Sequence, residues 1–262
     1  MHTIDALAQP RDGVAKLLVI PVGRSQSNHA EVSRSIGIGI IAALHPEGMT
    51  LPGDAELTAR FGVSRSVLRE SVKTLVAKGL LSTKARIGTR VRERAAWNMF
   101  DPDVLAWHLD AGVDKRFLRD LADIRLAVEP RAASLAALRR SPAMIARLRD
   151  SIVRMQASAS GSDAFAGADL RLHLDIATAS ANPFMRSIGA VIEAALRASF
   201  VLSAPVEDDE RERSIAAHSE IVDAIAASDA TRASAAMIEV IMNGLHRHGA
   251  AEDGSVTTEG GS

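Results

Sequence analysis

Three polar side chains in the second half of the sequence could share one ligand or one metal ion. Asp169 and His173 are four residues apart in a segment with helical spacing, so both lie on one helix face. Ile176 and Ala177 continue that face toward the core, and His218 lies in a second apolar stripe. A lone histidine in such a stripe is usually a core residue, but a carboxylate with two imidazoles suits a divalent ion such as zinc. The three residues therefore predict a buried site that binds either a metal or a ligand directly.

Arg125 and Glu129 form a second candidate pair, again at a spacing of four residues. Arg125 shares an apolar stripe with Leu121, Ile124 and Val128, which predicts that its guanidinium is buried or lines a cavity. One interpretation is a salt bridge within the helix, which stabilises it by about 0.2–0.5 kcal/mol. The other is a guanidinium that binds a ligand carboxylate with two parallel hydrogen bonds while Glu129 orients it. The sequence leaves both open.

A third group of side chains is cationic and lies in the first half of the chain. Arg65, Arg69 and Lys73 recur every four residues, with Ser66 beside them, on a flank next to the apolar stripe that begins at Leu68. Such a helix can bury one side and present the other to solvent or to phosphate groups. Taken alone, the pattern is more typical of a solvated face.

The elements around this cationic helix favour DNA. Residues 51–91 predict a short helix, a tight turn at Gly62, and a second helix that Ser64 caps and Gly79 ends. Two short strands, 80–83 and 89–92, then enclose a hairpin tip that contains Lys84, Arg86 and Gly88. This order predicts a winged helix-turn-helix, whose second helix enters the major groove of DNA.

The rest of the chain predicts a helical domain. Residues 1–27 are expected to form a flexible arm, 28–93 the DNA-binding domain, 94–103 a junction and 104–249 the second domain. The polar, glycine-rich residues 250–262 are expected to be a disordered tail. Helical periodicity in the second domain predicts the segments 104–109, 116–139, 142–157, 165–179, 183–203, 209–227 and 230–248. The fold class is therefore mostly α, with a small winged domain before an antiparallel bundle.

Composition and charge agree with a DNA-binding protein and exclude several other classes. The 262 residues are 47% apolar and contain no cysteine, which excludes a disulfide framework and thiolate metal ligands. No apolar segment is long enough to span a bilayer and no signal peptide is evident, so a cytoplasmic protein is expected. The net charge of −1 hides a balance of +5 over residues 28–94 and −7 over residues 95–262. A basic domain joined to an acidic one fits a DNA-binding head with a body that phosphates repel.

The first domain resembles the DNA-binding domain of GntR-type bacterial transcription regulators. The resemblance rests on LPGDAELTARFGVSRSVLRE and the closing GTRV within residues 28–93. It implies contacts to double-stranded DNA from Ser64, Arg65, Ser66 and Arg69, with help from the wing. The residues that we expect to contact DNA are Ser64, Arg65, Ser66, Arg69, Lys73, Lys84, Arg86 and Gly88. Two positions depart from the family, which often has arginine where this chain has Ala55 and glycine where it has Arg86.

The second domain resembles the effector (FCD) domain of the FadR-type branch of these regulators. IRLAVEP, DLRLHLDIATASANPFM and HSEIVDAIAASDATRA carry the resemblance. It implies a helical bundle around a ligand cavity, and a divalent metal, zinc first, held by one aspartate and three histidines. Three of these ligands map onto Asp169, His173 and His218, but the fourth falls on Val240. With three ligands, water or effector oxygens would complete the coordination.

The segment WNMFDPDVLAWHLD together with IRLAVEP is similar to repressors of galactonate and related sugar-acid catabolism. This resemblance implies a homodimeric, ligand-responsive repressor that binds an inverted-repeat operator and is released by a small carboxylate such as an aldonate. The residues expected to bind this effector are Arg125, Glu129, Asp169, His173, His218 and Asn243. The alternatives are a metal-dependent enzyme with a DNA-binding domain, which lacks an obvious general base, and an acyl-CoA sensor. We expect a regulator and no enzymatic activity.

Overall fold

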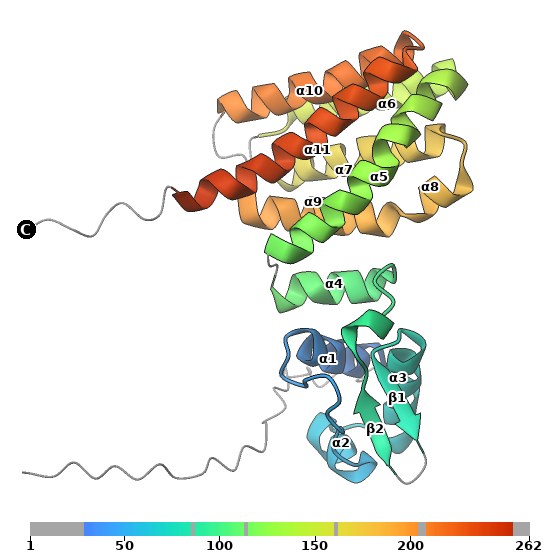
Figure 1. Ribbon diagram of the computed structural model, residues 1–262, viewed down its shortest axis with the longest axis vertical. Helices are drawn as coiled ribbons and strands as arrows, with labels where there is room; N and C mark the ends of the chain where they lie inside the picture. The colour runs from blue at the N-terminus through green and yellow to red at the C-terminus, as the bar shows by residue number, and fades with distance from the viewer. Residues whose placement is uncertain (1–28, 85–86, 113–114, 160–161, 204–207, 254–262) are drawn as a thin grey trace, which may run out of the picture. The chain divides into compact units, whose positions relative to one another are not determined.

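The fold is described from a computed structural model that covers residues 29–84, 87–112, 115–159, 162–203 and 208–253 (Figure 1). The chain divides into two units, Met1–Asn98 and Met99–Ser262. The boundary falls inside the predicted junction, residues 94–103. The arm expected at 1–27 and most of the expected tail lie outside the described residues. Within the described residues, none of the helices combines the length and the apolar character needed to cross a membrane.

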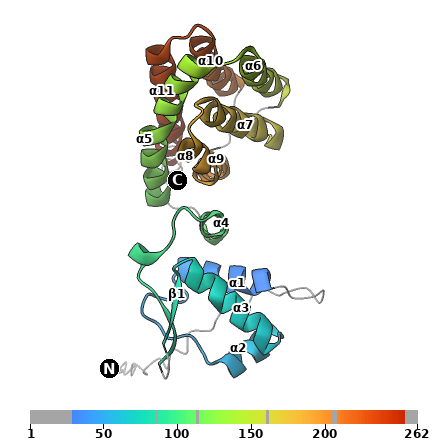
Figure 2. The same ribbon diagram turned by 90° about the vertical axis from the view of Figure 1, so that its right-hand side faces the viewer.

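The first unit is a three-helix domain with a hairpin, which confirms the predicted winged helix-turn-helix (Figure 2). Apolar residues of α1 and α2 pack against the buried Leu68 and Leu75 of α3. The Ser71 hydroxyl also donates a 2.9 Å hydrogen bond to the carbonyl of His29, which fixes α3 to the start of α1. The elements of this unit are α1 (His29–Ile41), α2 (Asp54–Phe61), α3 (Arg65–Ala77), β1 (Leu81–Lys84), β2 (Gly88–Val91) and the 3-10 turn η1 (Arg94–Ala96).

Local sequence explains where α3 begins and ends. The Ser64 hydroxyl accepts a 3.3 Å hydrogen bond from the amide of Val67, as expected of an N-cap. Gly62 in the turn before α3 has φ +64°, and Gly79 after it has φ +82°. Gly79 is also required for space, because a Cβ there would lie 2.2 Å from the carbonyl oxygen of Ala96. The end of α3 therefore packs directly against the chain that leaves this unit.

The hairpin is antiparallel and has one buried face. Its register pairs Leu81 with Val91 and Ser82 with Arg90. Leu81 and Val91 are buried, so the alternation along each strand directs Ser82, Lys84 and Arg90 away from the core. Thr50 forms a further, isolated antiparallel bridge with Arg90, so the chain at residue 50 lies beside β2.

The second unit consists of helices. In Figure 1, α5 and α11 lie side by side and antiparallel, and α10 also packs against α11. Its helices are α4 (Pro102–Ala111), α5 (Lys115–Arg139), α6 (Pro142–Ala157), α7 (Asp163–Ala179), α8 (Pro183–Ser187), α9 (Gly189–Ser203), α10 (Asp208–Ala226) and α11 (Ala230–Asp253). The mostly α fold class is confirmed.

Two apolar clusters stabilise this unit. The larger one joins α5, α6, α7, α10 and α11 and is rich in alanine, which lets the helix backbones approach closely. A smaller one joins Leu105 of α4, Phe117 and Leu121 of α5, and Val191 and Ala195 of α9. The α5–α9 pair therefore supports α4 on one side and reaches the larger core on the other.

Two helices differ from the sequence prediction: one predicted helix is divided in two, and another is longer than predicted. The single helix predicted over 183–203 is two helices, α8 and α9, because the chain turns at Ile188 before α9 begins at Gly189. A Cβ on Gly189 would lie 3.1 Å from Leu174 Cδ2, so α9 starts in close contact with α7. At the C-terminal end, α11 continues to Asp253, beyond the domain end expected at residue 249.

Candidate functional site

Three helices bring charged side chains into the core of the second unit. Arg125 and Glu129 come from α5, Asp169 and His173 from α7, and His218 from α10. All five are buried, with exposed fractions between 1% for His173 and 7% for Arg125. Buried ionisable groups cost free energy unless they are paired, so the way they pair defines what this site can do.

Glu129 connects two of these groups. Its carboxylate accepts a 2.5 Å hydrogen bond from Arg125 Nε and a longer one, 3.5 Å, from Nη2. Its Oε2 also lies in hydrogen-bond contact with Nδ1 of His173 on the facing helix α7. The sequence predicted the first pairing from the spacing of four residues. It gave no sign of the second, because two residues on different helices have no fixed spacing.

The contacts among Arg125, Glu129 and His173 lower the pKa of Glu129 and raise the pKa of His173. Burial alone would raise the pKa of Glu129, but the Arg125 guanidinium and His173 outweigh it and lower that pKa to about 2. Burial would likewise lower the pKa of His173, but the Glu129 carboxylate, with hydrogen bonding to Asp169, raises it to about 9. Glu129 is therefore a carboxylate that attracts positive charge to His173.

Both imidazoles are oriented by their Nδ1 atoms. His218 Nδ1 lies 2.6 Å from the carbonyl oxygen of Ser214, and His173 Nδ1 contacts Glu129. A carbonyl or carboxylate oxygen only accepts, so each Nδ1 carries a hydrogen, and either ring in its neutral form presents the Nε2 lone pair. The edge-on contact between the two rings, with centroids 5.6 Å apart, brings these Nε2 atoms toward the same space.

The two Nε2 atoms converge on one oxygen of Asp169. Oδ1 lies 2.9 Å from His218 Nε2 and 3.4 Å from His173 Nε2. Within the described residues these three buried atoms have no hydrogen bond of acceptable geometry, and they lie within 4.8 Å of one another. Burial would raise the pKa of Asp169, but His218 and His173 outweigh this and hold it well below its usual range. With a pKa of about 9, His173 carries a second proton at neutral pH, and that proton can lie between Nε2 and Asp169. A divalent ion could take the place of the proton, and one carboxylate oxygen with two imidazole nitrogens fits zinc.

The fourth ligand position contains no ligand. Val240 is 8% exposed and belongs to the apolar core on α11. Asn243, which we expected at the effector site, is exposed on α11, so the structure does not bring it to the buried cluster. Of the residues that follow Val240 on α11, Ile241 and Gly244 line a small gap beside Arg125. His246 is exposed as well.

Arg125 also reaches a small gap between α5, α9 and α11. The gap has a volume of about 20 Å³ and is lined by Leu118, Ala122, Arg125, Ala195, Ile241, Gly244 and Leu245. A volume of this size holds about one water molecule. The walls are apolar except for the guanidinium, so an anionic group that enters the gap would meet Arg125.

The predicted DNA-contacting residues of α3 lie on its solvent side. Ser64, Arg65, Ser66, Arg69 and Lys73 are all exposed. Lys73 is not an isolated cation, because its Nζ donates a 2.8 Å hydrogen bond to Glu70 three residues earlier. The α3 surface therefore presents Arg65 and Arg69 as cations, with Lys73 partly neutralised by its neighbour.

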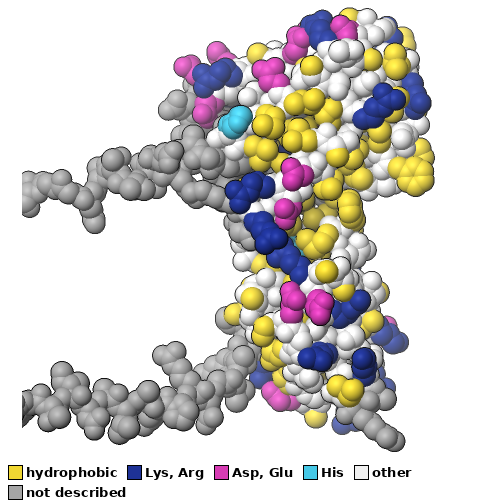
Figure 3. Space-filling model, viewed as in Figure 1, with side chains coloured by type: hydrophobic (Ala, Val, Ile, Leu, Met, Phe, Trp, Pro, Cys, Tyr) yellow, Lys and Arg dark blue, Asp and Glu magenta, His cyan; other side chains and the backbone are white. Residues whose placement is uncertain are grey.

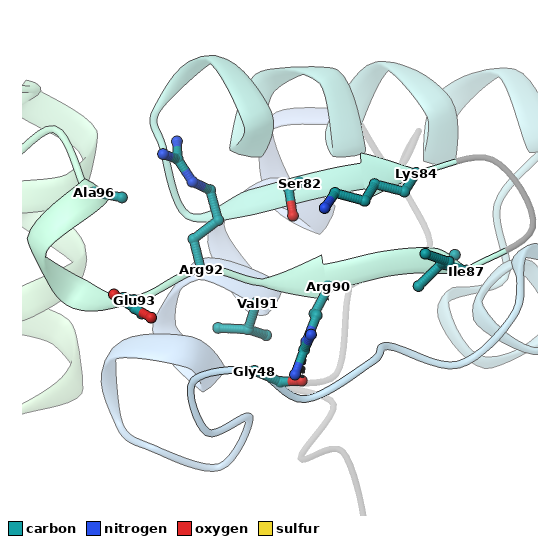
Figure 4. A pocket seen from close by; sticks show the side chains of 10 residues that line it. Gly48, Ser82, Lys84, Ile87, Arg90, Val91, Arg92, Glu93 and Ala96 are labelled. Atoms are coloured by element: carbon teal, nitrogen blue, oxygen red, sulfur yellow. Dashed lines mark hydrogen bonds between the residues drawn. The ribbon is translucent and has the colours of Figure 1, made fainter.

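The hairpin carries the predicted Lys84 and Gly88 and adds two cations that the sequence prediction did not include, Arg90 and Arg92 (Figure 4). Its outward face forms a depression of about 380 Å³, lined by Gly48, Ser82, Lys84, Ile87, Gly88, Arg90, Val91, Arg92, Glu93 and Ala96. Arg90 is held there by a 2.5 Å hydrogen bond from Nε to the Gly48 carbonyl. The alternation of side chains along β2 could have revealed Arg90 and Arg92, since they share a face with Gly88. Arg86 lies outside the described residues.

Comparison with known proteins agrees with both units. Residues 29–91 match the bacterial regulatory proteins of the gntR family, and residues 120–243 match the FCD domain. The galactonate operon transcriptional repressor of Escherichia coli (strain K12) is 30% identical over 213 residues, which cover 81% of this chain and 93% of that protein. The chain belongs to the GntR family of bacterial transcription regulators.

Two further proteins are similar to this chain over most of their own length. The HTH-type transcriptional regulator YieP of Escherichia coli (strain K12) is 32% identical over 192 residues, 72% of this chain and 82% of that protein. The solved structure of Lar from Listeria monocytogenes has a TM-score of 0.62 and 18% identity, and the match covers 88% of this chain and 100% of that one. The chain is thus a GntR-type transcription regulator that combines the DNA-binding domain of this family with an FCD domain.

Proposed function

We propose that this GntR regulator is a repressor that binds operator DNA in the cytoplasm as a homodimer and is released by a small carboxylate. The observation that carries the proposal is the buried chain of contacts Arg125–Glu129–His173 beside the converging atoms of Asp169 and His218. A core that served only stability would not need five buried ionisable groups, because apolar residues of similar volume are often as stable. Such a cluster is typical of a site that recognises a charged ligand.

Zinc is the metal that we propose for this cluster, with Asp169 Oδ1, His173 Nε2 and His218 Nε2 as its ligands. Two imidazoles and a carboxylate leave one position of a tetrahedral ion for water or for a ligand oxygen. The metal would supply a positive charge that attracts hydroxyl or carboxylate oxygens of an effector. The apolar Val240 at the fourth position supports an open coordination site over a closed structural one.

The proposed effector is a sugar acid, such as an aldonate. Arg125 would bind its carboxylate, and Asp169, His173, His218 or the metal would bind its hydroxyls. The similarity of this chain to the galactonate operon transcriptional repressor supports this class of effector. The gap at Arg125 has a volume of about 20 Å³, which is too small for an aldonate. The ligand must therefore stabilise an arrangement in which α5, α9 and α11 lie further apart. A ligand that binds the wider arrangement better shifts the population toward it.

The proposed DNA contacts come from α3 and the hairpin. Arg65, Arg69 and Ser66 would contact the major groove, and Ser64, Lys73, Lys84 and Gly88 would contact phosphates or the minor groove. A homodimer would place two such units on an inverted repeat. Exposed apolar residues of the second unit, Leu138 on α5 and Ile238 on α11, support a surface for the second copy. Figure 3 shows apolar side chains gathered on the face that carries α5 and α11 in Figure 1.

A thermal-shift panel with and without a metal chelator tests the effector and the metal together. The panel contains D-galactonate and other aldonates, with simple short-chain carboxylates and an acyl-CoA as the contrasting classes. We expect an aldonate to raise the melting temperature, and the chelator to reduce that rise. A rise with acyl-CoA alone would support the acyl-CoA sensor instead.

Gel-shift assays with operator DNA test release and DNA contact. Addition of the stabilising aldonate should free the DNA, and Arg65→Ala and Arg69→Ala should abolish binding while the effector-induced thermal shift is kept. Wild-type affinity in both variants would contradict the proposed role of α3.

A further inference from the structure

Glu129 is shared between a residue that we assign to the effector and a residue that we assign to the metal. One oxygen, Oε1, accepts from Arg125 Nε at 2.5 Å, and the other, Oε2, contacts His173 Nδ1. Its side chain is 3% exposed, so water does not compete for either oxygen. Any change in how strongly Arg125 attracts this carboxylate must therefore change how strongly the carboxylate attracts the His173 hydrogen.

Arg125 has N–H donors that its hydrogen bonds to Glu129 do not use. A guanidinium carries five N–H groups, and the bonds to Glu129 use one on Nε and one on Nη2. The same residue lines the gap between α5, α9 and α11. A carboxylate that enters the gap can thus bind the guanidinium while Glu129 stays in place, and its charge offsets part of the attraction between Arg125 and Glu129.

We propose that Glu129 is a positioning residue that couples the two ligands, so that a carboxylate at Arg125 strengthens metal binding at His173. When Arg125 is neutralised by the carboxylate, Glu129 becomes a stronger acceptor for His173 Nδ1–H, and Nε2 becomes a stronger metal ligand. Binding of the metal must then favour the carboxylate by the same factor, because coupling free energies are reciprocal. This inference rests on the zinc site of the proposed function, but it assigns Glu129 a role that metal binding alone does not require.

Replacement of Glu129 by glutamine tests the orienting contact at constant shape. The glutamine oxygen would accept from the Arg125 donors, which directs its NH₂ toward His173. His173 Nδ1 would then have to accept, and its hydrogen would move to Nε2, the atom needed for the metal. Glu129→Gln should therefore weaken zinc binding by about 10–100-fold.

Two more variants make the zinc measurement decisive. Glu129→Asp keeps the charge and the helical spacing to Arg125 but withdraws the carboxylate from α7, so it should also weaken zinc binding. Glu193→Gln is the matched control, because Glu193 forms a surface ion pair with Arg197 at the same spacing of four residues. Zinc affinities are measured by competition with a chromophoric chelator, and Co²⁺ absorption spectra report the ligand set.

The direction of coupling is tested without knowing the effector. Arg125→Met removes the pull on Glu129, as a bound carboxylate would, and should strengthen zinc binding by about fivefold or more. In the Arg125→Met/Glu129→Gln double variant that gain should vanish. If it persists there, simple loss of a repelling charge explains it, and Glu129 is not the link.

The outcomes separate the inference from the proposed function. If wild-type protein binds no zinc, the metal site fails and the coupling fails with it. Equal zinc affinity in wild-type, Glu129→Gln and Glu129→Asp protein leaves the metal site intact and overturns the role of Glu129. The inference is supported when both Glu129 variants lose affinity, with altered Co²⁺ spectra, while Glu193→Gln matches wild type.

Discussion

Removal of the Glu70 charge should tighten DNA binding, although Glu70 lies on the helix that we assign to the major groove. Glu70 and Lys73 are both exposed on α3, and their side chains form a 2.8 Å ion pair. The hydrogen bond from Lys73 lowers the pKa of Glu70, so the carboxylate is ionised at neutral pH. In Glu70→Gln, one negative charge leaves the DNA side of the helix and Lys73 becomes available to a phosphate.

The size of this effect follows from counterion release. Each additional phosphate contact steepens the dependence of log affinity on log salt by about 0.9, so two new contacts in the proposed dimer steepen that dependence by about 1.8. Between 50 and 200 mM salt, a fourfold range, this makes the gain in affinity about 12 times larger at the lower concentration. Because the gain comes from phosphates, binding to unrelated DNA should rise as much as binding to the operator.

Fluorescence anisotropy with operator and scrambled duplexes over this salt range measures both slopes. Glu56→Gln is the matched control, since Glu56 pairs with Arg60 at 3.0 Å on α2, away from the recognition helix. An unchanged or shallower slope in Glu70→Gln would refute the reasoning. A loss of affinity for the operator alone would instead identify Glu70 as a residue that reads a base.

Three further predictions concern the metal cluster and the ends of α3. His218→Ala should abolish the zinc-induced rise in melting temperature, which for wild type corresponds to about 2.7 kcal/mol at zinc 100 times above Kd, while His246→Ala, an exposed control, keeps it. Gly79→Ala should destabilise the first unit far more than Gly62→Ala in chemical denaturation, because both have positive φ but only at Gly79 would the Cβ meet an atom, Ala96 O at 2.2 Å. Ser64→Ala should lower the free energy of unfolding by about 1 kcal/mol through loss of the cap, and equal stability of the two proteins would contradict that assignment.

Much of the fold was predictable because local chemistry determines it. Ser64, Gly62 and Gly79 mark the helix ends through a hydroxyl acceptor and two positive φ angles, and the structure confirms all three. The division of 183–203 into α8 and α9 was not predictable from periodicity. The new helix begins at Gly189, which lies close to Leu174 of α7, and such tertiary contacts leave no periodic pattern.

The site was predictable in its members but not in its connections. Apolar stripes around Arg125, His173 and His218 predicted burial, and the structure places these side chains in the core. The contact of Glu129 with His173 joins residues 44 positions apart, and sequence spacing says nothing about such a pair. Asn243 shows the reverse error, since a polar residue one turn from Val240 was expected to face inward and is exposed.

The packing at Gly79 fixes the last residues of the first unit to the end of α3. The amide of Asn98 donates a 2.9 Å hydrogen bond to the carbonyl of Lys78, the residue that caps α3, and Trp97 beside it is buried. The chain thus leaves the unit directly after a hydrogen bond to the last turn of α3. A force applied to the backbone at residue 99 would therefore act first on the last turn of α3.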